Sequence, residues 1–213
     1  MPDLSQLRTE YMKGTLSEND LNPDPFKQFH DWFNEVLASK MPDPTVMVLS
    51  TCGSDKCPSS RMVLLKEFTP EGFTFFTHYQ SKKGRQIEQN PYGALLFPWN
   101  MLERQVRIEG KIVKVSPEKS DEYFQSRPEG SRIGAWTSPQ SEEIPSRELL
   151  VDQENKLRNE FKTSTIPRPP QWGGYCLIPD LFEFWQGRES RLHDRFEYYS
   201  DDGVSWKIRR LAP

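Results

Sequence analysis

Apolar residues recur at helical spacing near the start of the chain, after a polar stretch. Positions three and four apart lie on one face of an α-helix, so these residues form a single stripe: Phe26, Phe29, Trp32, Phe33, Val36 and Leu37. Asp24 followed by Pro25 is typical of an N-cap and the first helical position. The pattern predicts a helix from about residue 25 that packs on a larger core.

Between about residues 45 and 116 the pattern changes to short runs of β-branched and aromatic residues separated by turns. We expect five strands here: TVMVLSTC, SSRMVLLKEF, GFTFFTHY, GALLFPW (broken by Pro98) and RQVRIEGKIVKVS. Three more strands close the chain: GGYCLIPDLFEFWQG, SRLHDRFEYYS and GVSWKIRRL. The segments PEKSDEYFQSR and 146–162 have helical patterns.

Seven or eight strands with short turns and three peripheral helices predict a mainly β fold, a small antiparallel barrel. A length of 213 residues suits one domain. We therefore expect a flexible N-terminal arm, 1–24, and a single domain, 25–213.

Composition narrows the class of protein. The 26 aromatic residues (13 Phe, 7 Tyr, 6 Trp) supply a core, and the net charge of −3 argues against nucleic-acid binding by bulk charge. No apolar run is long enough for a membrane span or a signal peptide. Three cysteines without CxxC spacing fit the reducing cytoplasm, and three scattered histidines predict no metal site.

Arg61 and Lys66 lie at the ends of the segment RMVLLK. In one continuous strand, odd and even positions face opposite sides, so the two cations would project oppositely unless a bulge intervenes. They would then serve two ligands or two ends of one ligand. A strand with solvated ends is the alternative interpretation.

The segment SKKGRQ, residues 81–86, gathers Lys82, Lys83 and Arg85 directly after a predicted strand. Backbone N–H groups and ammonium charges converge in such a loop when it begins a helix, which favours phosphate binding. A basic solvated turn is the alternative.

Tyr123, Arg127 and Ser131 recur every four residues in YFQSRPEGSR. They would share a face of an unbroken helix, but Pro128 is expected to end it and leave Ser131 on the following turn. A phenol, a guanidinium and a hydroxyl together suit a phosphate monoester. A solvated helix face is the alternative.

The segment SRLHDR, residues 190–195, is expected to be part of a strand that alternates Arg191, His193 and Arg195 on one face. Two guanidiniums beside an imidazole repel one another unless an anionic or electron-rich ligand lies among them. An exposed polar strand face is equally consistent. Trp185 faces away from Phe182 and Phe184 and is a core residue or a ring for a ligand.

The residues alone therefore offer many cations and few nucleophiles, which favours binding of phosphorylated small molecules over hydrolysis. Several segments in combination go further: RMVLLK, FFTHYQSKKG, RQVRIEG, YFQSRPEGSRIGAW, SPQS, WGGY, FEFWQG, SRLHDR and RLAP. In this order, from about Arg8 to Pro213, the chain resembles the pyridoxine (pyridoxamine) 5′-phosphate oxidase family, FMN enzymes of vitamin B6 metabolism. The resemblance implies an FMN-binding split barrel that forms a homodimer with two sites at the subunit interface.

The resemblance also assigns residues. It implies that FMN binds Arg61, Met62, Val63, Leu64, Phe76, Thr77, Lys82, Lys83, Gln105, Gln140, Ser141, Trp185 and Arg195. It implies that substrate binds Lys66, Tyr123, Arg127, Ser131, Arg191, Leu192 and His193, with Arg8 and Tyr11 of the arm closing over the pocket. Arg191 and His193 would be the catalytic pair, lying over the pyridine ring. Lys82 stands where arginine is common, which keeps the charge but loses bidentate geometry.

The implied reaction oxidises pyridoxine or pyridoxamine 5′-phosphate to pyridoxal 5′-phosphate, with hydride transfer to the flavin N5. Dioxygen then reoxidises the flavin and gives hydrogen peroxide, with ammonia from the amine. Three rivals remain: a flavin-barrel reductase for another substrate, a non-catalytic carrier or sensor, and an oligonucleotide-binding barrel. The full set of substrate-side residues argues against the first rival, and the acidic pI against the third. Peroxide production would distinguish an oxidase from the second rival, because a carrier or sensor produces none.

Overall fold

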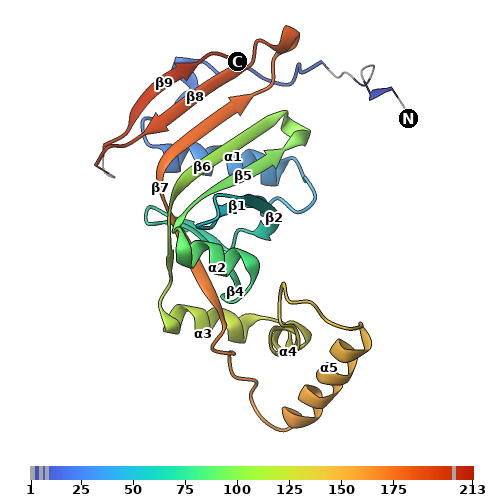
Figure 1. The fold of residues 1–213 in the computed structure, drawn as a ribbon. Coiled ribbons are helices and arrows are strands. Elements are labelled where there is room, and N and C mark those ends of the chain that lie inside the picture. Colours follow the sequence, from blue (N-terminus) through green and yellow to red (C-terminus); the bar gives the residue numbers. More distant parts are fainter. Residues whose placement is uncertain (1–2, 5–6, 8–9, 203–204) are drawn as a thin grey trace. The chain divides into compact units, whose positions relative to one another are not determined.

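A computed structural model describes residues 3–4, 7, 10–202 and 205–213. The described helices (Figure 1) are α1 Pro25–Ala38, α2 Lys82–Gln89, α3 Pro117–Ser126, α4 Glu129–Thr137 and α5 Glu148–Glu160, with 3₁₀ turns at Glu18–Asp20, Asn100–Leu102 and Glu189–Arg191. The described strands are β1 Val46–Cys52, β2 Pro58–Leu64, β3 Glu67–Thr69, β4 Gly72–His78, β5 Tyr92–Trp99, β6 Arg104–Lys114, β7 Trp172–Gln186, β8 Asp194–Tyr199 and β9 Lys207–Leu211.

Hydrogen bonds order the strands as β2-β1-β5-β6-β7-β4-β3, and β8 pairs with β7 and β9. The β3–β4, β4–β7, β7–β8 and β8–β9 pairs are antiparallel. By contacts, the chain divides into two compact units. Unit 1 comprises 1–49, 94–110 and 179–213, and unit 2 comprises 50–93 and 111–178. Among the described residues, no helix has both the length and the apolar character that a membrane crossing requires.

The core of unit 1 forms around the predicted helix α1. The Asp24 carboxylate accepts a hydrogen bond from the Phe26 N–H at 2.9 Å, which confirms the predicted N-cap. Phe29 is fully buried and packs edge-on against Phe97, and Trp32 packs at 89° on Phe184. The predicted apolar stripe therefore packs on the core through Phe29, Trp32 and Val36, whereas Leu37, which the pattern also included, is exposed.

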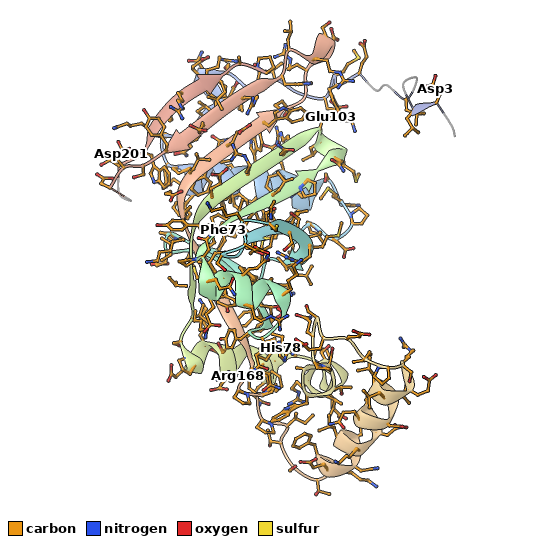
Figure 2. All side chains as sticks on the ribbon, viewed as in Figure 1. Asp3, Phe73, His78, Glu103, Arg168 and Asp201 are labelled. Atoms are coloured by element: carbon orange, nitrogen blue, oxygen red, sulfur yellow. The ribbon has the colours of Figure 1, made fainter. Side chains whose placement is uncertain are left out.

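In the described part of the arm, backbone N–H groups donate hydrogen bonds to two carboxylates elsewhere in unit 1. Glu103, labelled in Figure 2, accepts hydrogen bonds from the N–H groups of Met12 and Lys13, at 2.8 and 2.9 Å. Asp194 accepts one from the Leu16 N–H at 3.1 Å, and the Leu16 side chain is buried. These bonds fix the course of residues 12–16 along the unit.

Unit 2 is built around β4, which pairs with β7 from Phe73↔Leu177 to His78↔Trp172. Helix α2 follows at once, and its N-cap Ser81 accepts a hydrogen bond from the Gly84 N–H. A Cβ at Gly84 would lie 1.8 Å from the Tyr79 carbonyl, so only glycine lets the helix start this close to the strand. Helices α3, α4 and α5, the segment after α5 and the start of β7 together form a second small core. Its buried members are Phe124, Ile133, Leu157, Ile166 and Trp172.

Several sequence expectations were wrong in detail. The segment expected as one strand, SSRMVLLKEF, forms β2 and β3, with a break at Leu65 and Lys66. Pro98 lies within β5 rather than ending it. Pro128 ends α3 as expected, but it is also the N-cap of α4, a helix that contains Ser131. Proline suits the start of a helix because its missing N–H is not needed there.

Candidate functional site

A groove of about 750 Å³ lies within unit 2. Its walls come from β2, β4, α2 and the start of β7, from α3 and α4, and from the turn after α4. It brings together most of the residues that the sequence assigned to a site: Arg61, Met62, Val63, Leu64, Lys66, Phe76, Thr77, Lys83, Tyr123, Arg127, Ser131 and Gln140. Residues far apart in the sequence therefore meet at one place.

One cluster in the groove lining is built around Lys83, which is buried. Its ammonium donates to the Gln140 amide oxygen at 2.8 Å, to Thr77 Oγ1 at 3.1 Å and to Ser81 Oγ at 3.3 Å. Burial, with the nearby charge of Arg61, lowers the pKa of Lys83 to about 8. Among the described residues, no carboxylate forms an ion pair with Lys83. A cation desolvated in this way favours an anionic ligand.

Arg61, whose charge acts on Lys83, is held by hydroxyl groups. Its guanidinium donates to Thr51 Oγ1 at 2.7 Å and to Ser59 Oγ at 2.5 Å. Both hydroxyls in turn donate to the Gln86 amide oxygen, each at 2.7 Å. Burial lowers the pKa of Arg61, which nevertheless stays charged. The network orients the guanidinium without neutralising it.

A second cluster in the groove lining is an aromatic stack beside Arg127. The rings of Phe76 and Tyr123 are stacked with centroids 3.9 Å apart, and Phe76 stacks on Trp172 at 5.5 Å. The Arg127 guanidinium lies 4.5 Å from the Trp172 ring centroid. Its Nη1 atom is buried and has no hydrogen-bond partner among the described residues. Such a donor is costly unless a ligand accepts from it, and burial also lowers the pKa of Arg127.

Lys66 and Ser131 are exposed and also line the groove. The expectation that Arg61 and Lys66 project to opposite sides applied to one continuous strand. That strand is broken between β2 and β3, and alternation stops at Leu64, so it does not fix the direction of Lys66.

A second group of predicted residues gathers within unit 1. The rings of Trp185 and His193 have centroids 4.6 Å apart, and Tyr11 lies 5.7 Å from each of them, edge-on to Trp185. His193 Nδ1 accepts a hydrogen bond from the Arg188 N–H at 3.1 Å, so the neutral ring carries its proton on Nε2. Burial and the charge of Arg191 lower the pKa of His193.

Arg191 is not on the strand that the sequence predicted. It ends a 3₁₀ turn, Glu189–Arg191, with a φ of 64°, and β8 begins only at Asp194. The predicted alternation of Arg191, His193 and Arg195 is therefore wrong for its first two members. Arg191 and Leu192 are both exposed.

Arg195 is paired with a carboxylate that sequence reasoning missed. Glu183 is buried, and its two oxygens accept from Arg195 Nε at 2.8 Å and from Arg107 Nη2 at 2.5 Å. Burial acts to raise the pKa of Glu183, but the hydrogen bonds from the two arginines outweigh it and lower the pKa. The sequence FEFW carried no signal for this pairing, because strand alternation places Glu183 on the face opposite Phe182 and Phe184, where an acid is ordinarily solvated.

The remaining predicted residues lie elsewhere. Gln105 is half-buried on β6 in unit 1. Lys82 is exposed at the first position of α2, and Ser141 is exposed next to Gln140; neither lines the groove. Arg8 lies outside the described residues. Trp172 and the hydroxyls that hold Arg61 were missed, since nothing in their local sequence distinguishes them from core or turn residues.

Comparison with known proteins places this geometry in a family. Residues 33–159 match the family model described as pyridoxamine 5′-phosphate oxidase. Residues 172–213 match the pyridoxine 5′-phosphate oxidase C-terminal dimerisation region. The chain belongs to the pyridoxine/pyridoxamine 5′-phosphate oxidase family. A family member from Cupriavidus taiwanensis, named pyridoxine/pyridoxamine 5′-phosphate oxidase, is 52% identical over 213 residues, the full length of both chains.

Two solved structures confirm the fold of this oxidase family. PhzG from Burkholderia lata 383, in complex with tetrahydrophenazine-1-carboxylic acid, has a TM-score of 0.86 at 29% identity, over 92% of this chain and 95% of its own. A pyridoxamine 5′-phosphate oxidase-related, FMN-binding protein from Nostoc punctiforme has a TM-score of 0.70 at 17% identity, over 91% and 100%. The predicted fold class, a mainly β split barrel with peripheral helices, is confirmed.

Proposed function

We propose that this family member is an FMN-dependent oxidase that converts pyridoxine 5′-phosphate and pyridoxamine 5′-phosphate to pyridoxal 5′-phosphate. One observation carries the proposal: the lining of a single groove holds both a desolvated cation pair, Arg61 and Lys83, and a buried Arg127 Nη1 donor that has no hydrogen-bond partner among the described residues. Two phosphate esters need two such cationic groups.

The residues present fit FMN. Lys83 and Arg61 would hold its phosphate, because both are charged and desolvated, and Lys82 at the start of α2 would add charge. The β2 segment from Met62 to Leu64, together with Phe76, Thr77, Gln140 and Ser141, would hold the rest of the cofactor. Each charged hydrogen bond to a phosphate contributes about 1.5–3 kcal/mol.

The substrate phosphate would bind Arg127, with Lys66, Tyr123 and Ser131 around it. The face of Trp172 already orients Arg127, so its side chain loses little conformational freedom when it donates to a bound phosphate. The Trp172 ring, which stacks in turn on Phe76 and Tyr123, covers one face of the guanidinium.

When bound, FMN would supply the redox chemistry, namely hydride acceptance from the carbon that becomes the aldehyde and electron transfer to dioxygen with formation of hydrogen peroxide. The chain itself aligns the reactants. We propose that Arg191 and a neutral His193 orient and polarise the substrate ring, and that Leu192 contacts it. Tyr11 and Arg8 of the arm, 1–24, would close over it.

We further propose that a homodimer forms and that Gln105, Trp185, Arg191, His193 and Arg195 reach the groove of a second copy. The match of residues 172–213 to a dimerisation region supports this arrangement. Each copy would then act as one functional domain over residues 25–213. The three cysteines are free thiols, in keeping with a cytoplasmic location.

An absorbance spectrum of the purified protein tests the proposal. A flavin band that pyridoxamine 5′-phosphate bleaches anaerobically, and that air restores with one peroxide per turnover, is the expected result. A carrier would bind FMN without bleaching. Bleaching by a reduced phenazine precursor but not by either vitamin phosphate would instead favour a PhzG-like activity.

A further inference from the structure

The connection between α4 and α5 contains a strained tight turn, Pro139–Glu142. The Glu142 N–H donates to the Pro139 carbonyl at 3.0 Å, which closes the turn. Ser141, at the third position, has a φ of 76°, in the left-handed region that favours glycine. A serine is held there only where its surroundings fix the backbone.

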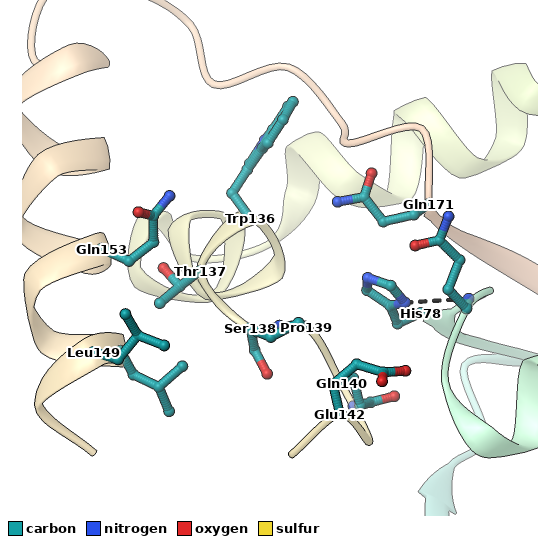
Figure 3. Close-up of a pocket in the computed structure, with 12 residues that line it drawn as sticks. His78, Trp136, Thr137, Ser138, Pro139, Gln140, Glu142, Leu149, Gln153 and Gln171 are labelled. Carbon is teal, nitrogen blue, oxygen red and sulfur yellow. Dashed lines mark hydrogen bonds between the residues drawn. The ribbon is translucent and has the colours of Figure 1, made fainter. Parts of the chain in front are cut away.

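Packing does little to fix this turn. Ser138 and Gln140 line the large groove, while Ser138, Pro139, Gln140 and Glu142 line a second cavity of about 340 Å³. Figure 3 shows the turn between Leu149 and Gln153 of α5 on one side and His78 and Gln171 on the other. Residues 138–142 are all exposed. The turn is thus a thin partition with open space on both faces.

Three polar contacts anchor the partition to the body of unit 2. On the groove side, the Gln140 amide oxygen accepts from Lys83 Nζ at 2.8 Å and from Thr77 Oγ1 at 3.3 Å. On the other side, Glu142 accepts from Arg85 Nη1 at 2.6 Å. The same Arg85 Nη1 also donates to the Gln80 carbonyl at 2.6 Å, so the guanidinium is itself fixed at the start of α2. The anchors flank Ser141 on both sides.

We propose that the Arg85–Glu142 ion pair is a positioning device that keeps Gln140 and Ser141 in place for FMN. This role rests on the proposed function, because it presumes that FMN binds in the groove. Neither side chain of the pair lines the groove, so the pair acts on the cofactor only through the turn.

A double-mutant cycle tests the proposal. Glu142→Gln and Arg85→Gln should each raise the FMN Kd, measured by flavin fluorescence, about two- to fivefold, the effect of an exposed ion pair. The double variant should be no weaker than either single variant. At saturating FMN, the KM for pyridoxine 5′-phosphate should not change. Glu154→Gln, which breaks the exposed pair with Arg158 on α5, is the matched control and should leave the Kd unaltered.

Hydrogen exchange gives a readout that does not depend on FMN. Glu142→Gln should speed exchange in a peptide covering 138–145, and adding Ser141→Gly should slow it again, since glycine adopts a positive φ without strain. Additive Kd losses in the double variant, a Kd in Glu142→Gln equal to that of Glu154→Gln, or unchanged exchange would each overturn the proposal. Failure of the wild-type chain to bind FMN would instead overturn the proposed function. The hydrogen-exchange result would then still test whether the Arg85–Glu142 pair holds the turn in place.

Discussion

The Arg127 guanidinium lies 4.5 Å from the centroid of the Trp172 ring, with its Nη1 atom buried and unpartnered among the described residues. Stacking on Trp172 holds the guanidinium in place, while the buried Nη1 donor lacks an acceptor among the described residues. Under the proposed function, a phosphate oxygen of the substrate accepts the hydrogen bond from this donor.

Arg127→Ala should therefore raise the KM for pyridoxine 5′-phosphate about tenfold to a hundredfold, the loss of one charged hydrogen bond. FMN content should stay near that of the wild-type chain. Steady-state kinetics with the flavin absorbance of the same samples check both statements, and Arg158→Gln on α5 serves as the control. A variant that loses its flavin but keeps its KM would reverse the assignment of Arg127.

FMN affinity should depend on pH through Lys83. The pKa of this buried lysine is about 8, below the ordinary 10.5, and a bound phosphate dianion favours the protonated form. FMN binding then takes up a proton once the pH exceeds 8, so the Kd should rise as the pH rises from about 8 toward the pKa of the complex. Fluorescence titrations at a series of pH values measure this, and Lys83→Arg should flatten the curve. A wild-type Kd that is constant over this range would contradict the prediction.

Glu183 should contribute to stability in a pH-dependent way. Its pKa is lowered in the folded chain, so its stabilising effect is present above the ordinary value of 4.5 and is lost as the pH falls below 4.5 through the folded pKa. Glu183→Gln leaves Arg107 and Arg195 on a neutral amide and should lower the free energy of unfolding by about 1.5–3 kcal/mol at neutral pH. Urea denaturation at neutral and acid pH checks it: the difference between variant and wild type must shrink in acid.

His193 should set an acid limb in the pH profile of kcat/KM. Its pKa lies below 6.5, and protonation of Nδ1 would break the hydrogen bond from the Arg188 N–H. Activity of the wild type should fall as the pH drops through that pKa, while His193→Gln should lack this limb. The substrate phosphate titrates equally in both enzymes, so only the difference between the two profiles counts. Identical acid limbs would show that His193 is not the titrating group.

The sequence predicted most elements because their patterns are local. The stripe from Phe26 to Leu37 and the Asp24–Pro25 cap required only helical spacing and one hydrogen bond, and both are present. The break at Leu65 and Lys66 was missed, since RMVLLKEF has no glycine or proline to mark it. The left-handed backbone at Ser190 and Arg191 was missed for the same reason.

The candidate site was predicted unevenly. The residues of RMVLLK, SKKG and YFQSRPEGS meet in one groove, although only the family resemblance said which ligand each would serve. Partners distant in sequence could not be foreseen from spacing: Glu183 on Arg195, Trp172 beneath Arg127, and Gln140 on Lys83. These contacts depend on how the strands pair and the helices pack.

Arg210 on β9 grips two carboxylates, donating through Nε and Nη2 to Glu18 and through Nη1 to Asp194. Glu18 is synthesised 192 residues before Arg210. The Glu18–Arg210 ion pair can therefore form only after nearly two hundred further residues have left the ribosome. Until then, this part of the arm lacks its cationic partner.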